Sequence, residues 1–331
     1  MADVVLQHVS KAFGATEAVR SVSMGIADGD FMVLLGPTGA GKTTTLRLIS
    51  GLDRPDQGDI LIGGRSVIED TPAQRNVAMV FQQYSLYPHM TVRENLAFPL
   101  KSPALRTPPR IIAAKVAEVA EVLHIAHKMD NKATQLSGGE MQRVSIGRAL
   151  VRTPKIFLMD EPLSSLDAKL RADLRVELKR IQESLGATLL YVTHDQIEAM
   201  TMATSIGVLD EGKLVQVGTP REIYENPVSL YVAGRLGLPR INTLPADIFA
   251  GAPCGATTIG LRPEHIQTGD GKSAKVQRIE HLGDQTRLHL TLDNHDIITL
   301  TDAHTELAPG DSLAIQPTNA LYFDAAGQRV A

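Results

Sequence analysis

The sequence predicts an α/β protein, in which a mainly parallel sheet covered by helices is followed by a small all-β domain. Two observations predict this architecture. Short, nearly all-apolar runs end at Leu35, Met159 and Thr193 and alternate with segments of helical period, which is typical of a covered parallel sheet. Beyond about residue 236 the helical period disappears, and apolar residues alternate with polar ones between Gly, Pro and Asn turns. We therefore expect domains at 1–235 and 236–331.

The composition limits the possible functions. The 331 residues suffice for two or more domains, and their 43% hydrophobic content is ordinary for a protein with a full core. The net charge of −4 gives no basic excess that would suggest a nucleic-acid partner. The single cysteine, Cys254, cannot form an internal disulfide, which fits a reducing cytoplasm. No run approaches the ~18 apolar residues needed to span a bilayer, and no secretory signal is visible at the N-terminus.

The first informative element of the α/β region is a glycine-rich segment between a strand and a helix. It follows the G-x-x-x-x-G-K-T spacing of a P-loop, after the apolar run 31–35 and before a helix that starts near Thr43. Its glycines let backbone N–H groups curl around phosphate oxygens; Lys42 is expected to reach the terminal phosphates, and the Thr43 hydroxyl to bind Mg²⁺. The sequence therefore predicts a nucleoside triphosphate site made by Gly36, Pro37, Thr38, Gly39, Ala40, Gly41, Lys42, Thr43 and Thr44.

The second informative element is the segment Leu136–Glu140, which opens another helix. Ser137 and Glu140 have the spacing of a capping box, which accounts for the helix start. The box does not account for Gly138 and Gly139, since a glycine inside a helix costs about 1 kcal/mol relative to alanine. We therefore expect a group to approach this backbone closely, and an anion at the helix N-terminus is the natural candidate.

Together these two segments resemble the nucleotide-binding subunit of an ABC transporter, and further motifs of that family follow in the right order. The apolar run that ends in Asp160 and Glu161 resembles Walker B, which implies that Asp160 serves Mg²⁺ and that Glu161 polarises the attacking water. Asp167 ends a segment that resembles the D-loop, and His194 resembles the switch histidine on the γ-phosphate. Gln82 resembles the Q-loop glutamine near Mg²⁺ and the attacking water.

Other parts of the chain fit the same family. Phe13 resembles the aromatic residue that stacks on adenine, with an ordinary core position as the alternative, and Ala18 and Val19 are expected to close the adenine pocket. A helical subdomain is expected over about 86–152 of the P-loop NTPase domain. The C-terminal region resembles the OB-like, TOBE-type barrel of carbohydrate-importer ATPases, through the segments 217–227, 260–266 and 279–283.

The resemblance implies partners as well as a fold. The ATP-binding site of one chain is expected to be completed by residues of a second copy, so that the subunit works as a homodimer. Two transmembrane permease subunits are expected to dock near Gln82–Glu94, and an extracytoplasmic solute-binding protein to act through them. The chain is then peripheral, on the cytoplasmic face of the bacterial inner membrane. The residues expected to contact ATP in trans are Gln135, Ser137, Gly138, Gly139, Glu140 and Asp167.

The sequence departs from the family pattern at three positions: Asn131 and Arg235 replace an arginine and an aromatic residue, and Glu140 stands where glutamine is commoner. The expected function is ATP hydrolysis that drives uptake of a sugar or sugar-like polar solute. One alternative is an importer of a polyamine, iron or sulfate, and another is a soluble ABC ATPase acting on ribosomes or nucleic acid. The single P-loop and the lack of sustained heptads or a basic patch disfavour the soluble alternative.

Overall fold

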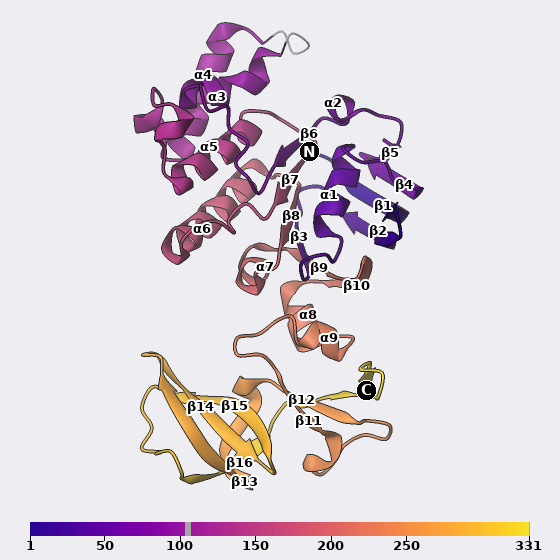
Figure 1. The fold of residues 1–331 in the computed structure, drawn as a ribbon, viewed down its shortest axis with the longest axis vertical. Helices are drawn as coiled ribbons and strands as arrows, with labels where there is room; N and C mark the ends of the chain where they lie inside the picture. Colours follow the sequence, from indigo (N-terminus) through magenta and orange to yellow (C-terminus); the bar gives the residue numbers. More distant parts are fainter. Residues whose placement is uncertain (103–106, 331) are drawn as a thin grey trace. The chain divides into compact units, whose positions relative to one another are not determined.

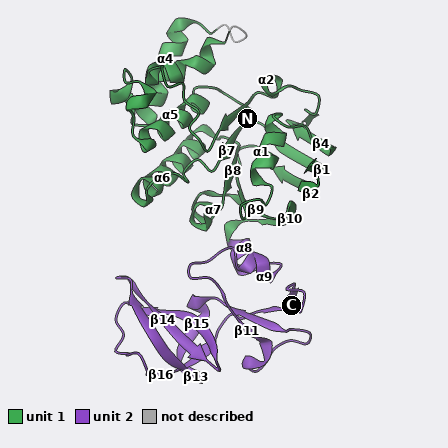
Figure 2. Cartoon of the chain, in the orientation of Figure 1, with its two compact units in different colours: residues 1–220 green, residues 221–331 purple. Residues whose placement is uncertain are grey.

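The computed structural model describes residues 1–102 and 107–330, which form two compact units, 1–220 and 221–331 (Figures 1 and 2). The sequence places the boundary after residue 235, whereas the division in the structure falls after Pro220. The segment between these positions holds two short helices, α8 (Pro220–Glu225) and α9 (Leu230–Ala233). Tyr224 contributes a backbone carbonyl to Arg262 of the second unit, so this segment packs with the residues that follow it.

A six-stranded sheet forms the centre of the first unit, in the order β10-β9-β3-β8-β7-β6. All its neighbouring strands are parallel except β9 and β10, which form a hairpin. Every residue of β3, β7 and β8 is buried, which explains why their sequences are apolar throughout instead of alternating. The α/β class is confirmed. The strands are β3 (Phe31–Leu35), β6 (Val77–Val80), β7 (Ile156–Asp160), β8 (Leu189–Thr193), β9 (Ser205–Asp210) and β10 (Lys213–Gly218).

A second, antiparallel sheet lies in the first unit, in the order β2-β1-β4-β5. Its apolar residues, such as Val4, Leu6 and Ile60, join the strands of the parallel sheet in one core cluster. This sheet was not predicted from the sequence. Register shifts in the pairing of β1 with β2 interrupt its alternation between Leu6 and Val9 and again near Lys11. The strands are β1 (Val4–Phe13), β2 (Thr16–Ile26), β4 (Gln57–Ile62) and β5 (Arg65–Ser66).

Seven α-helices, α1 to α7, are described in the first unit, and they include those that begin at the predicted motifs. Within the expected helical subdomain, α4 ends at Val122 because the chain leaves helical geometry at Leu123. In Figure 1, α3, α4 and α5 gather at one end of the unit, and α4 and α5 both pack on α3. The helices are α1 (Lys42–Ser50), α2 (Pro72–Arg75), α3 (Val92–Ala97), α4 (Pro109–Val122), α5 (Gly138–Leu150), α6 (Ala168–Leu185) and α7 (Gln196–Met202).

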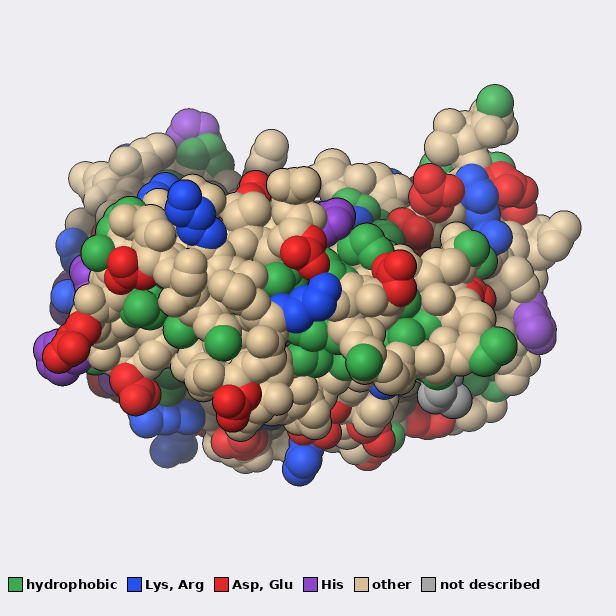
Figure 3. Space-filling model, turned by 90° about the horizontal axis from the view of Figure 1, so that it is seen from below, with side chains coloured by type: hydrophobic (Ala, Val, Ile, Leu, Met, Phe, Trp, Pro, Cys, Tyr) green, Lys and Arg blue, Asp and Glu red, His purple; other side chains and the backbone are tan. Residues whose placement is uncertain are grey.

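The second unit contains two four-stranded antiparallel sheets, β11-β12-β17-β18 and β15-β14-β13-β16. Alternate residues of β14, such as Leu288 and Leu290, are buried in a common core, as the alternating pattern predicts. The all-β character of this region is confirmed. Its strands are β11 (Asn242–Pro245), β12 (Thr258–Leu261), β13 (Ile266–His281), β14 (Gln285–Leu292), β15 (His295–Asp302), β16 (Ser312–Pro317), β17 (Leu321–Phe323) and β18 (Arg329–Val330). On the face drawn in Figure 3, basic and acidic side chains are interspersed.

Candidate active site

The loops that follow β3, β7 and β8 converge at one edge of the parallel sheet, and a cavity of about 640 Å³ opens there. Parallel strands bring their carboxyl ends to the same edge, which is where α/β sheets bind ligands. Gln82 and Glu161 join the P-loop in the wall of this cavity, so the structure brings together motifs that are far apart in the sequence. The lining residues are Thr16, Glu17, Ala18, Arg20, Thr38, Gly39, Gly41, Lys42, Thr43, Thr44, Gln82, Glu161 and Glu211.

The P-loop is close-packed against neighbouring backbone, which leaves no room for side chains at two of its glycines. A Cβ atom at Gly36 would lie 2.7 Å from the carbonyl oxygen of Leu209. A Cβ at Gly41 would clash with the carbonyl oxygen of Ala18, and Gly41 also has a φ of 96°, which favours glycine. These glycines therefore let the loop fold tightly at the start of α1, where free N–H groups suit an anion.

Lys42, the first residue of α1, is buried at the cavity wall with only 5% of its surface exposed. Its Nζ donates hydrogen bonds to the carbonyl oxygens of Gly36 at 2.9 Å and Pro37 at 3.0 Å. The same atom lies 3.6 Å from Oε1 of Glu161. Burial lowers the pKa of Lys42, while the carboxylate of Glu161 raises it in opposition. A further anion in the cavity would favour the charged amine.

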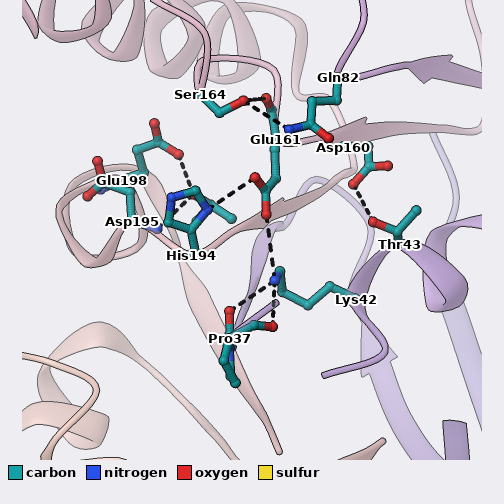
Figure 4. A network of polar contacts seen from close by, with 12 residues as sticks. Pro37, Lys42, Thr43, Gln82, Asp160, Glu161, Ser164, His194, Asp195 and Glu198 are labelled. Atoms are coloured by element: carbon teal, nitrogen blue, oxygen red, sulfur yellow. Dashed lines mark hydrogen bonds and ion pairs between the residues drawn. The ribbon is translucent and has the colours of Figure 1, made fainter. Parts of the chain in front are cut away.

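Glu161 occupies the centre of the polar network in Figure 4, between Lys42 and His194. Its Oε2 atom lies 3.1 Å from Nδ1 of His194, and its other carboxylate oxygen faces Lys42. Its backbone has a φ of 43°, which is unusual for a residue other than glycine, and its amide donates to the carbonyl of Val192 on β8. Such a strained conformation persists only where surrounding contacts fix it, and it is concentrated at functional sites.

Asp160, the last residue of β7, faces the start of α1. Its Oδ1 accepts a hydrogen bond of 2.9 Å from the Thr43 hydroxyl. Burial raises the pKa of Asp160, and the Thr43 hydrogen bond lowers it in opposition. The pair offers a carboxylate and a hydroxyl oxygen, the ligand types that suit Mg²⁺. Among residues 1–102 and 107–330, no group of three or more His, Cys, Asp or Glu side chains could hold a metal. Mg²⁺ that binds together with a nucleotide commonly takes further oxygen ligands from phosphates and water.

A buried carboxylate, Glu198, lies beside the strand end that carries His194, and it was not predicted from the sequence. Glu198 is 2% exposed and accepts hydrogen bonds from Tyr191 Oη at 2.9 Å and Thr193 Oγ1 at 2.6 Å. Asp195 caps the helix that carries Glu198, through the N–H groups of Ile197 and Glu198. These contacts hold the residues on either side of His194. The signal in the sequence was Glu198, the one charged residue of the short segment Gln196–Met202 that follows the histidine.

The residues expected around the adenine divide into exposed and buried ones. Phe13 ends β1 with 50% of its surface exposed, which rules out the alternative of an ordinary core position. Lys11 places its Nζ 5.5 Å from the centre of the Phe13 ring. Val19 does not line the cavity in this structure, since its side chain is 2% exposed and packs in the core beneath β2. Strand alternation brings its neighbours Ala18 and Arg20 to the cavity instead.

The segment Leu136–Glu140 lies away from this cavity, none of whose lining residues comes from it. Ser137 caps α5, and Glu140 Oε2 accepts from the Ser137 amide at 2.8 Å, so the predicted capping box is present. Both glycines also have close neighbours within this chain. A Cβ at Gly139 would clash with the Leu170 side chain, and one at Gly138 would lie 3.2 Å from Tyr84 Oη. Side chains of the same chain therefore already approach both glycines closely.

The other residues expected to act in trans have local roles in this chain. Asp167 caps α6, with its Oδ1 accepting from the Leu170 amide at 3.0 Å. Gln135 Oε1 accepts from the Lys132 amide at 2.9 Å, which closes the short turn ahead of α5. Asn131 contributes its backbone carbonyl to the Val92 amide. These contacts leave the Asp167 and Gln135 side chains outside the cavity wall.

A second, smaller cavity of about 240 Å³ lies where β6 and the segment after it meet α5 and the 3₁₀ turn Phe98–Lys101. We call it the aromatic groove. Arg148 stands over the Tyr87 ring, 4.8 Å from its centre, and Tyr87 also packs on Phe98. The groove combines ring faces with two cationic side chains. It is lined by Ala78, Met79, Phe81, Tyr84, Ser85, Tyr87, Phe98, Pro99, Ser145, Arg148, Ala149 and Arg152.

In the part of the chain that the structure describes, no helix is long and apolar enough to cross a membrane. Arg235, which replaces an aromatic residue of the family pattern, stands over the Tyr231 ring at 4.5 Å from its centre. Arg262, in the segment that resembles the importer barrel, is 1% exposed and donates to the carbonyls of Tyr224, Ala233 and Leu236.

Comparisons with known proteins identify the family. A model of the ABC transporter family matches residues 19–164, and one of the TOBE domain matches residues 259–322. The sn-glycerol-3-phosphate import ATP-binding protein UgpC of Ruegeria sp. (strain TM1040) is 44% identical over the full length of both chains. UgpC of Brucella abortus biovar 1 (strain 9-941) is 48% identical, over 89% of this chain and 88% of its own.

Solved structures of ABC transporter cassettes resemble the first unit. The ADP form of the cassette MJ1267 has a TM-score of 0.62 and 26% identity, over 70% of this chain and 98% of its own. The dimeric cassette MJ0796 has a TM-score of 0.60 and 30% identity, over 66% of this chain and 99% of its own. Given this likeness and the identity to full-length relatives, the chain belongs to the ABC transporter family, as one of its nucleotide-binding, ATP-hydrolysing subunits.

Proposed function

We propose that this ATPase subunit powers a bacterial importer for a sugar or sugar-like polar solute, with sn-glycerol 3-phosphate as the first solute to test. The observation that carries the hydrolytic role is the position of Glu161, held between Lys42 and His194 at the mouth of the 640 Å³ cavity. Full-length relatives that are named sn-glycerol-3-phosphate import proteins support the choice of solute.

Each side chain of the network has a role that its geometry supports. The P-loop N–H groups and Lys42 bind and orient the phosphates of ATP, because backbone and amine donors converge on the cavity. Thr43 and Asp160 would hold Mg²⁺, which neutralises phosphate charge when bound. Glu161 accepts a proton from the attacking water, and His194 orients the Glu161 carboxylate through their 3.1 Å contact. Gln82, also in the cavity wall, orients that water.

The nucleotide site is completed by a second copy of the chain. Support comes from the distance in the fold between the P-loop cavity and the segment Leu136–Glu140, which lines no part of it. A solved cassette of the family with 30% identity is a dimer. In such a two-fold arrangement Ser137, Gly139 and Asp167 of one chain face the nucleotide of the other. Gln135, Gly138 and Glu140 then help to shape that surface.

Ser137→Arg tests this composite site. The bulky cation at the start of α5 should block closure on the partner's nucleotide, so ATP hydrolysis should fall below about 1% of the wild-type rate. ATP binding to the monomer should stay unchanged, because Ser137 lies outside the cavity wall of its own chain. The two quantities are measured by phosphate release and by equilibrium binding of a labelled ATP analogue. Loss of monomer binding would show that the segment acts in cis.

We propose that each of the two transmembrane subunits docks at the aromatic groove of one ATPase chain. The groove is lined in part by Tyr84, Ser85 and Tyr87, which belong to the expected docking segment Gln82–Glu94. Its exposed Phe81 and Phe98 rings, with Arg148 and Arg152 nearby, suit a helix that presents apolar residues and a carboxylate. The chain is then peripheral on the cytoplasmic face of the inner membrane, and a solute-binding protein acts from the other side.

The experiment that tests the function is a solute screen. The full chain is co-expressed with the transmembrane subunits of its system, the complex is reconstituted in proteoliposomes with the binding protein, and ATP hydrolysis is measured. We expect sn-glycerol 3-phosphate or a sugar to raise the rate several-fold and to be taken up. A response to a polyamine, iron or sulfate would instead assign that solute class. A rate indifferent to every solute and to the membrane subunits would contradict a role in import.

A further inference from the structure

One side chain of the aromatic groove, Tyr84, also reaches two segments that we propose as parts of the composite ATPase site. Its hydroxyl lies 3.0 Å from Oγ of Ser165, in the segment 164–167 between β7 and α6. The same hydroxyl would lie 3.2 Å from a Cβ atom at Gly138, at the start of α5. Tyr84 therefore contacts the groove, the turn after Glu161 and the start of α5 at once.

The turn that Tyr84 contacts is tied directly to the hydrolytic carboxylate. Ser164 Oγ donates to the backbone carbonyl of Glu161 at 2.9 Å, and Gln82 Nε2 lies 3.5 Å from that same hydroxyl (Figure 4). A shift of Ser165 would be transmitted through its neighbour Ser164 to the strained backbone of Glu161. The other end of the turn is held as well, since Arg171 donates to the carbonyl of Leu166 at 2.7 Å.

The neighbouring ring, Tyr87, provides a contrast within the same groove. Its ring packs on Phe98, with ring centres 4.4 Å apart, and lies under the guanidinium of Arg148. These contacts remain among groove residues. Two tyrosines three positions apart thus share one surface, but of the two it is Tyr84 whose hydroxyl is hydrogen-bonded to the turn that carries Ser165.

We propose that Tyr84 is a positioning residue that links occupancy of the aromatic groove to the turn 164–167 and to the start of α5. The proposal rests on the proposed function, in which a membrane subunit occupies that groove. A partner that packs on the Tyr84 ring shifts its hydroxyl relative to Ser165 and Gly138. The partner thereby favours one arrangement of the hydrolytic carboxylate over another, which is the differential contact that coupling between two sites requires.

A double-mutant cycle on the isolated full-length chain tests the link itself. Tyr84→Phe and Ser165→Ala remove the same hydrogen bond from its two ends, so each should lower kcat about two- to tenfold. The double variant should be no slower than the slower single variant, because the bond is already lost. The KM for ATP should stay unchanged, since neither residue lines the ATP cavity. As control, Tyr87→Phe combined with Ser165→Ala should give the product of the single effects. Multiplicative effects for Tyr84→Phe with Ser165→Ala would overturn the link.

A second measurement tests transmission from the groove. The ATPase rate of wild type and Tyr84→Phe is measured alone and after co-purification with the membrane subunits, in detergent. Wild type should be stimulated, and Tyr84→Phe should still co-purify while its stimulation falls about two- to tenfold. Equal stimulation of both proteins would overturn the inference and leave the docking proposal intact. Absence of both co-purification and stimulation in wild type would overturn the docking proposal itself, and with it this role for Tyr84.

Discussion

Both units of the molecule bury cations, and Lys42 of the first unit and Arg262 of the second are held in different ways. In the first unit Lys42 is 5% exposed, bonds two carbonyls of its own loop and faces Glu161 at 3.6 Å. In the second unit Arg262 is 1% exposed, donates to the carbonyls of Tyr224, Ala233 and Leu236, and stacks with its guanidinium carbon 3.6 Å from the Tyr224 ring centre. Burial lowers the pKa of both groups.

The difference shows how a buried charge can serve a ligand in one place and the fold in another. The lysine amine is a compact charge on a flexible stem at the wall of an open cavity, so a phosphate can become its partner. The rigid, planar guanidinium fork of Arg262 is occupied by backbone carbonyls that tie together segments 224–236 of the second unit. Under the proposed function Lys42 therefore serves phosphate binding, whereas Arg262 serves the stability of the second unit.

The largest effect expected from this comparison is on Glu161, the carboxylate beside Lys42. Glu161→Gln keeps the size of the side chain but removes the carboxylate that we propose as the base, so kcat should fall about 10²- to 10⁴-fold. ATP affinity should stay close to that of wild type, since the P-loop is untouched, and the ATP-bound dimer should accumulate. Phosphate release, nucleotide binding and light scattering measure the three quantities.

Glu183→Gln provides the matched control, because this glutamate pairs with Lys179 on the exposed side of α6, away from the cavity. It should hydrolyse ATP at the wild-type rate. Near-normal turnover in Glu161→Gln would contradict the role of Glu161 as base. It would then no longer be supported that the buried charges of the first unit serve hydrolysis.

The fold could be predicted where burial leaves a strong pattern in the sequence. The strands β3, β7 and β8 are buried on both faces, so their apolar runs are unbroken and their ends nearly coincide with the predicted ones. The β1–β2–β4 sheet escaped prediction because its bulges break the alternation and its polar residues, such as His8 and Ser10, interrupt the apolar signal. Pairing between distant segments has no local signature.

The candidate site was predictable as a set of motifs, but not as a set of contacts. Sequence spacing indicated Lys42, Glu161 and His194, while their mutual distances depend on how three parallel strands align. The contact that explains a glycine at position 139 could not be predicted either, because it also joins segments that are distant in the sequence. Leu170 packs against it from α6, a helix that follows in the sequence only after another strand. The buried orientation of Val19 likewise depends on the register of β2.

An intermediate effect is expected when Arg262 is replaced. Arg262→Met keeps much of the apolar stem but leaves three buried carbonyls without their donor, at a cost of about 1–3 kcal/mol for each unsatisfied group. We expect the second unit to lose about 3 kcal/mol or more of stability, measured by hydrogen exchange in peptides from residues 221–330.

Arg329→Met is the control for this change, because Arg329 is exposed and lies 5.8 Å from the centre of the Phe323 ring. Its loss should cost less than about 1 kcal/mol. Nucleotide binding by the first unit should survive both substitutions. Unchanged exchange in Arg262→Met would contradict the assignment of this cation to the fold.

The smallest effect is expected at a cation that the solvent reaches, near the opposite end of α1 from Lys42. Arg47 is joined to Asp53 by two hydrogen bonds of 2.6 and 3.1 Å, but 43% of the Arg47 side chain is exposed. Asp53→Asn should therefore lower the free energy of unfolding at pH 7 by less than about 1 kcal/mol.

The Arg47 hydrogen bonds lower the pKa of Asp53, so the folded chain binds this proton less readily than the unfolded chain. The contribution is then complete above the usual Asp pKa and is lost as pH falls through the lowered value. Urea unfolding of both proteins between pH 7 and pH 3 measures it: the two should converge at the acid end. If the difference persists at acid pH, or is as large as that of Arg262→Met, then solvent exposure does not determine how much each of these cations contributes to stability.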